Sequence, residues 1–305
     1  MEKIDQDLLK EIADIDGTIH GAYNIRKNGK GIERKITDNV NIITKADKSG
    51  IDIYVKENTK FDFVHIPVII TQSGLNDIVY NDFYIGQNAN VVIMAGCGIH
   101  NDAHLDSQHD GIHRFFLEEG AKVKYIEKHY GKGNGDGKRI LNPVTQIHLK
   151  DGSTFEMDSI QIKGVDSTIR TTKGILEENT NLVISEKIMT HGSQYAKTSF
   201  EVSLNGNHSS TKVTSRSVAT ENSIQQFESK VEGNSICFGH VECDAIIQDN
   251  AKVIAIPSII ANHVDANLVH EATIGKIAGE QLIKLMSLGL SEKEAEQEII
   301  NGFLK

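Results

Sequence analysis

Residues 200–207, Phe-Glu-Val-Ser-Leu-Asn-Gly-Asn, show the pattern that decides the fold. Phe200, Val202 and Leu204 alternate with polar residues, which is typical of a β-strand with one buried face. The Asn-Gly-Asn that follows supplies the residues of a tight turn. The same alternation, broken by similar turns, continues over residues 61–260 with little helical pattern. A mainly β core is therefore predicted, and strands of this spacing fit either a sandwich or a solenoid because no strict repeat decides between them.

Both ends of the chain instead carry helical periodicity. Near the start, apolar residues recur at near-helical spacing, at Leu8, Leu9, Ile12 and Ile15. Near the end, an apolar stripe covers residues 274–286, and Ser291 with Glu294 forms a capping box that begins a last helix. The pattern predicts three regions: a helical or irregular one at 1–60, a β core at 61–262 and a helical one at 263–305.

Composition narrows the class of protein. The chain has 305 residues and a formal net charge of −10, without a basic patch that could neutralise phosphates, so nucleic acid is not expected as a partner. No apolar segment approaches the roughly 18 residues that span a bilayer, so no membrane partner is expected either. The three cysteines, Cys97, Cys237 and Cys243, are too few for a disulfide framework. We expect a cytoplasmic protein with reduced thiols.

One cysteine and four histidines lie close together in the sequence, at Cys97, His100, His104, His109 and His113. Thiolate and imidazole suit zinc or iron, and the two four-residue intervals place each histidine pair on one face. The spacing matches no standard zinc finger. Two interpretations stay open: a metal site, or histidines bonded to the neighbouring aspartates.

A second group of iron-binding residue types lies near the C-terminus, at Cys237, His240, Cys243, His263, His270 and Glu271. Cysteine is the usual ligand of iron–sulfur clusters, although a free cysteine is often simply a small buried hydrophobe. An enzyme that uses Cys243 as a nucleophile, with His270 as its base, also stays open. The glycine-rich segment 131–137 does not have the spacing of a phosphate-binding Walker A loop, so ATP hydrolysis is expected in another chain.

Around these residues the sequence resembles the SufB/SufD family, and it is most similar to the SufB branch. The resemblance rests on five stretches near the C-terminus: Cys243-Asp-Ala-Ile-Ile through Pro257, Ala266-Asn-Leu-Val-His-Glu-Ala-Thr273, Gly279-Glu-Gln-Leu282, Gly289-Leu-Ser-Glu292 and Ile299-Ile-Asn-Gly-Phe303. The chain is shorter than most bacterial SufB proteins, and its Cys97–His113 segment looks typical of short archaeal relatives.

The resemblance implies a right-handed β-helix, a solenoid, with a short N-terminal helix and C-terminal helices. It also implies a scaffold for iron–sulfur cluster assembly and transfer rather than an enzyme. The expected partners are a SufC-type ABC ATPase docked on the C-terminal helices, a second copy of the chain bound through the β-helix, a sulfur donor and apo iron–sulfur acceptor proteins.

The resemblance also assigns the site. It implies that Cys243 and Glu271 bind the nascent cluster, expected to be a transient [4Fe–4S] cluster, and that His270 matches the histidine of SufD proteins. Cys97, His100, His104, His109 and His113 remain candidates for a second site with zinc or iron. Two alternatives stay open: a structural β-helix that binds metal without transferring clusters, and the cysteine-dependent enzyme.

Overall fold

The computed structural model describes residues 2–15 and 17–305, and 58% of the chain is in strands. The helices are α1 (Lys3–Ala13), α2 (Gly279–Ser287) and α3 (Glu292–Phe303). The strands are β1 (Ala22–Lys27), β2 (Lys30–Lys35), β3 (Val40–Thr44), β4 (Gly50–Val55), β5 (Asp62–Ile70), β6 (Asn76–Ile85), β7 (Asn90–His100), β8 (Ser107–Leu117), β9 (Lys122–Lys132), β10 (Arg139–Leu141), β11 (Val144–Leu149), β12 (Thr154–Lys163), β13 (Ser167–Leu176), β14 (Asn181–Thr190), β15 (Tyr195–Leu204), β16 (Ser209–Ala219), β17 (Ile224–Gly233), β18 (Cys237–Ile247), β19 (Lys252–Ala261) and β20 (Ala266–Gly275).

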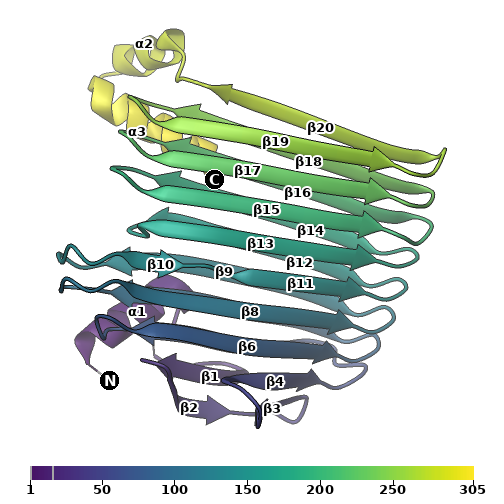
Figure 1. The fold of residues 1–305 in the computed structure, drawn as a ribbon. Coiled ribbons are helices and arrows are strands. Elements are labelled where there is room, and N and C mark those ends of the chain that lie inside the picture. The colour runs from purple at the N-terminus through teal and green to yellow at the C-terminus, as the bar shows by residue number, and fades with distance from the viewer. Residues whose placement is uncertain (1, 16) are drawn as a thin grey trace.

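The strands wind into a solenoid of about 8 turns, which confirms the predicted β core and selects the solenoid over the sandwich (Figure 1). Sheet A has the order β2-β1-β5-β7-β9-β12-β14-β16-β18-β20, and sheet B runs from β3 to β19. From β4 and β5 onward neighbouring strands pair in parallel, and hydrogen bonds join residues 27 to 32 positions apart. These unequal coil lengths explain why the sequence shows no strict repeat.

Side chains alternate between the inside and the outside of the coils. On β15, Phe200, Val202 and Leu204 are buried while the residues between them are partly exposed, as the pattern at 200–207 predicts. Toward the N-terminal half, aromatic rings fill the interior: Phe115 lies 4.3 Å from Phe83 and 4.9 Å from Phe155 between ring centroids. Each such pair adds about 0.5–1.5 kcal/mol beyond the burial of its apolar area.

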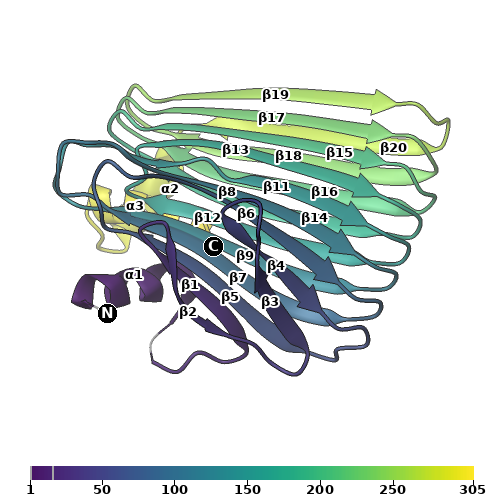
Figure 2. The ribbon, with the colours of Figure 1, turned by 60° about the horizontal axis from the view of Figure 1, so that its bottom comes forward.

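Regular structure extends further than the expected boundaries at residues 61 and 262. Strands β1 to β4 lie before residue 61 at the N-terminal end of the solenoid, and β20 lies after residue 262 (Figure 2). A tight turn joins β1 to β2 through Asn28 and Gly29, which both have positive φ. Asn-Gly is the strongest hairpin signal in a sequence, and it marks these strands.

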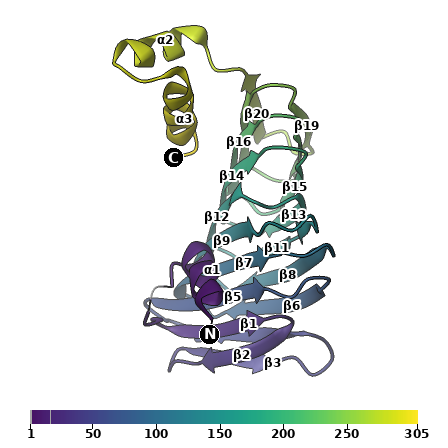
Figure 3. The same ribbon diagram turned by 90° about the vertical axis from the view of Figure 1, so that its left-hand side faces the viewer.

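Both helical segments lie on the sheet A side of the solenoid (Figure 3). The capping box of α3 forms as predicted, between Ser291 and Glu294, and Ile300 packs with Val218 of β16 against the outer face. In α2, by contrast, no residue is buried. None of the described helices is long and apolar enough to span a membrane.

Helix α1 packs against β7 at a glycine, which has no side chain to keep the helix away. Leu8 and Ile12 of the helix are fully buried, and the Ile12 carbonyl oxygen would lie 2.3 Å from a Cβ built on Gly96. The helix can approach so closely only because residue 96 is glycine.

We therefore expect Gly96→Ala to displace α1 and leave the coils folded. Overpacking of this kind costs about 1–3 kcal/mol, which is local because α1 lies outside the solenoid. Hydrogen exchange should become faster in residues 3–13 and stay unchanged in β14 to β18. Gly275→Ala is the matched control, since no atom lies within 4 Å of its added Cβ. Unchanged exchange of α1 in Gly96→Ala would contradict this account.

Candidate functional site

Strands β18 and β20 bring the C-terminal candidates together. They are parallel neighbours in sheet A, and their register aligns Cys243 with Ala272 and Val241 with His270. Strand β19 of sheet B lies between these two strands in the sequence. They become neighbours because the chain returns to sheet A after β19. Two of the five stretches that carry the resemblance therefore lie side by side in the sheet.

Alternation places these residues on different faces. Cys243 is 1% exposed and lies inside, with Val241 and the other core residues of β18. His270 has the same parity on β20 as Leu268, which packs on the core, so it also faces inward. Glu271 is aligned with Glu242 and faces outward. The described chain therefore brings Cys243 and His270 onto one face and leaves Glu271 on the other.

The inward His270 lacks polar partners. Both of its ring nitrogens are buried, and neither has a hydrogen bond within the described residues. Burial, together with the charge of His240, lowers the pKa of His270. A buried imidazole that is neutral and unbonded is costly unless something else binds it. Its nitrogen lone pair is available to a metal.

Glu271 has a partner on the outer face. One of its carboxylate oxygens lies 3.4 Å from Nε2 of His240, and its side chain is 64% exposed. Carboxylate and imidazole are both metal-binding groups, so Glu271 and His240 are a second pair of candidate ligands, separated from Cys243 by the thickness of the sheet. Both candidate pairs lie on the same two strands.

The thiol of Cys243 is not activated by its surroundings. Burial raises its pKa to about 12, and the negative charges of Glu186 and Asp244 act in the same direction. At neutral pH the sulfur therefore holds its proton until a metal or a proton acceptor removes it. This environment suits a ligand better than a free nucleophile.

The three cysteines are far apart. Cys237 and Cys243 both face inward on β18, six residues apart, which is about 20 Å along a strand. Cys97 lies on β7, five strands from β18 in sheet A, or about 24 Å away. All three are free and buried. One chain can therefore present only one thiolate to a cluster at β18.

The site lies at an open end of the solenoid. No described strand pairs with the far side of β20 in sheet A or of β19 in sheet B, and both lie at the top of the stack in Figure 1. On β19, Ile254, Ile256 and Ile259 are 44%, 49% and 43% exposed. An edge with unpaired backbone groups and apolar side chains favours addition of another chain.

The Cys97–His113 segment is divided by the fold. Cys97 on β7 and His109 and His113 on β8 point into the solenoid and are buried. His100 and His104 instead lie at the outer turn, where they pair with Asp102 and Asp136. The described residues contain no group of three or more histidine, cysteine or acidic side chains arranged to hold a metal.

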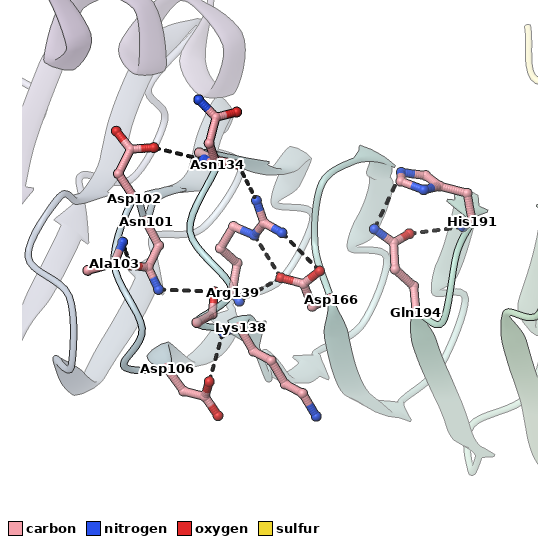
Figure 4. A network of polar contacts seen from close by, with 12 residues as sticks. Asn101, Asp102, Ala103, Asp106, Asn134, Lys138, Arg139, Asp166, His191 and Gln194 are labelled. Carbon is pink, nitrogen blue, oxygen red and sulfur yellow. Dashed lines mark hydrogen bonds and ion pairs between the residues drawn. The ribbon is translucent and has the colours of Figure 1, made fainter.

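The outer turn itself is held by polar contacts to the glycine-rich loop. The carboxylates of Asp102 and Asp106 accept hydrogen bonds from the backbone N–H groups of Asn134 and Lys138, at 2.8 and 2.7 Å (Figure 4). These bonds connect loops of successive coils. Segment 131–137 therefore serves as a packed turn against its neighbour.

The interior holds a polar cluster that sequence reasoning missed. Arg170 is fully buried between Glu127 and Glu186, and its Nη2 lies 3.1 Å from Nδ1 of His129. Burial lowers the pKa of both His113 and His129 to about 4, so both are neutral near pH 7. The cluster is drawn from β8, β9, β13 and β14, so no local spacing could reveal it. The alternation of these residues within their strands was the only signal.

Comparison with known proteins shows which family the sequence matches. Residues 68–303 match the family model described as SUF system FeS cluster assembly, SufBD core domain. An iron–sulfur cluster assembly SufBD family protein of Methanocaldococcus jannaschii is 27% identical over 83% of this chain and 79% of its own length. A SufBD family protein of Pyrococcus horikoshii is 28% identical over 84% of this chain, which spans 57% of that relative.

A third relative matches more locally. The iron–sulfur cluster assembly protein SufB of Bacillus subtilis is 37% identical over 89 residues, which is 28% of this chain and 18% of that protein. Since the family model covers most of the solenoid and both C-terminal helices, the chain belongs to the SufBD family of iron–sulfur cluster assembly proteins.

Proposed function

We propose that this protein is a scaffold on which a nascent iron–sulfur cluster is bound at the open end of the solenoid and from which the cluster is transferred. The observation that carries the proposal is that buried Cys243 and His270 share the inner face of the neighbouring strands β18 and β20, and that the ring nitrogens of His270 have no hydrogen bond within the described residues. The cluster is cargo, built from iron and from sulfur delivered by a donor and passed on to apo acceptor proteins.

A second copy would complete the ligand set. A [4Fe–4S] cluster takes four ligands, and one chain offers Cys243 and His270 on the inner face. A twofold pair joined through the exposed edges of β19 and β20 supplies two of each. Glu271 and His240 on the outer face would serve as exchangeable ligands during loading or release. Mixed sulfur and nitrogen ligation holds a cluster less firmly than four thiolates, which suits transfer.

The C-terminal helices offer a surface for the ATPase partner. Ile283, Met286 and Leu288 on or next to α2 are 68%, 42% and 76% exposed, while α3 is anchored to sheet A. An apolar helical face of this kind seats in a groove of another protein. We propose that a SufC-type ABC ATPase docks here and drives cluster assembly.

The alternative of a cysteine-dependent enzyme is weaker. A nucleophilic cysteine needs a lowered pKa or an adjacent base, whereas the pKa of Cys243 is raised to about 12. A structural metal site at Cys97 is the other alternative. Cys97, His109 and His113 line one small buried cavity, although the described residues contain no group of three or more ligand side chains arranged to hold a metal.

Cys243→Ser should abolish most cluster binding. After anaerobic reconstitution with iron and sulfide, the variant should lose most of the visible charge-transfer absorbance of wild type, because one of the two inner ligands is gone. Cys237→Ser is the matched control, since it is equally inward on the same strand but about 20 Å away. If Cys243→Ser kept a full cluster while its melting temperature matched wild type, the assignment would be wrong.

Charged substitutions on α2 should prevent ATPase binding. Ile283→Asp combined with Leu288→Asp removes the apolar surface without touching the anchor of α3, so co-purification with the SufC-type ATPase should fall at least tenfold. Lys293→Asp, at an exposed position of α3, controls for the added charge. If the double variant recovered as much ATPase as the wild-type protein, the docking surface would lie elsewhere.

A further inference from the structure

A cavity of about 520 Å³ opens at the N-terminal end of the solenoid. It is lined by the β1–β2 hairpin, by β3 and β4, and by β5 and β6, and Figure 2 turns this end of the molecule forward. Strand β1 lies eight strands from β20 in sheet A, or about 38 Å, so the cavity is remote from the proposed cluster site. Small-molecule sites commonly have volumes of roughly 300–1,000 Å³, and this cavity has that size.

Part of the cavity wall is apolar. Ile51 of β4, Ile66 of β5 and Val79 of β6 line it, and all three side chains are buried inside the first coils. Ile32 of β2 also lines the cavity and is 47% exposed. A ligand with an apolar body would remove this surface from water, which favours binding.

Arg34 of β2 brings a positive charge to the cavity without a carboxylate to match it. Its Nε donates to Oδ1 of Asn24 and its Nη2 to Oγ1 of Thr44, both at 2.9 Å, and its Nη1 donates to the carbonyl oxygen of Ile42 at 3.3 Å. All three acceptors are neutral. Two of the five N–H donors of the guanidinium therefore have no partner in the described part of the chain. Arg34 is exposed, so a ligand can reach it from solvent.

The other charged groups of the cavity do not cancel the charge of Arg34. Glu33 is the one acidic residue among the described residues that line the cavity, and its carboxylate accepts a hydrogen bond from the hydroxyl of Tyr23 at 2.6 Å. Tyr23 packs beneath α1 on the outer face, so that carboxylate turns away from the cavity. The nearest carboxylate to Lys48 is Asp47, 4.0 Å away and 75% exposed, and such a surface pair contributes little.

Arg26 is neutralised, and it fixes the wall of the cavity. Its Nε and Nη2 donate to the two carboxylate oxygens of Asp77 at 2.9 and 2.6 Å, and Nη2 also donates to Oγ of Ser49 at 2.8 Å. These bonds connect β1 to β6 and to the turn before β4. Arg34 and Lys48 remain as the cations of a preformed cavity whose charge is not balanced.

We propose that this cavity binds a small organic anion, a phosphate or carboxylate with an apolar body. The free N–H donors of Arg34 bind the oxygens of the anion, since a guanidinium fork matches paired oxygens of this kind. Lys48 adds charge, and Ile51 and Val79 cover the apolar body of the ligand. The site is separate from the proposed cluster scaffold and does not depend on it.

The test follows the full ¹⁵N-labelled chain by NMR during titration with hexyl phosphate or hexanoate, with 1-hexanol as the neutral match. The backbone amides of Ile51 and Val79 should shift with at least one anion at millimolar concentration. 1-Hexanol should bind at least about tenfold more weakly, because it makes no charge-assisted hydrogen bond. Iron is not needed, so the result is independent of cluster binding by Cys243.

Two variants should each weaken binding of the anion about tenfold. Arg34→Gln removes the unmatched charge, and Lys35→Gln is its matched control, since Lys35 is aligned with Tyr23 on the other face of the hairpin. Gly31→Glu adds a carboxylate to the cavity lining where no atom lies within 4 Å of the added Cβ. Gly302→Glu on α3, which is equally open around its Cβ, is the control for that change.

Affinity for the anion equal to that of wild type in both Arg34→Gln and Gly31→Glu would overturn the proposal. So would equal binding of 1-hexanol, or the absence of shifts around the cavity with either anion. Arg34 also links β2 to β3 through Thr44 and Ile42. If the spectrum of Arg34→Gln shows the first coil unfolded, Gly31→Glu alone decides, because it leaves those bonds in place.

Discussion

The constraint on which the rest of the structure depends is the parallel register between successive coils. Each strand of sheet A repeats the positions of the strand one coil earlier, so a side chain that faces inward lies next to another inward side chain. The interior is consequently a set of rows parallel to the axis. One row of sheet A collects Glu127, Glu186 and Cys243, and one row of sheet B aligns Phe83 with Phe115.

Because each row has its own side chains, different parts of the interior differ in polarity. Aromatic and aliphatic side chains fill one part, whereas a buried arginine with two carboxylates occupies another. Replacing a buried ion pair with apolar residues is often neutral or stabilising by about 1–4 kcal/mol, so stability alone does not explain why the charges are there. The open end of the solenoid exposes β20, the strand next to the one that carries Cys243, to a partner.

Sequence patterns predicted the elements better than the site. Alternation at 200–204 and the capping box at Ser291 each report on residues close in the chain, and both are confirmed. The grouping of Cys97 with His100 and His104 also relied on residues that are close in the chain. Strand β7 ends in a turn, however, so Cys97 faces the interior while His100 pairs with Asp102 at the turn. Glu186 and His129 could not be found, because their contacts with Ser215 and Arg170 join residues 29 and 41 positions apart in the chain. The placement of Glu271 opposite Cys243 follows from parity, which is visible only once the register is known.

The central claim is that the cluster is held on the inner face of β18 and β20. Anomalous diffraction at the iron edge from crystals of anaerobically reconstituted protein tests it most directly. Iron density is expected beside Sγ of Cys243 and a ring nitrogen of His270, at an edge shared by two copies. Iron density beside Cys97 and the buried histidines of β8, with none at Cys243, would contradict it.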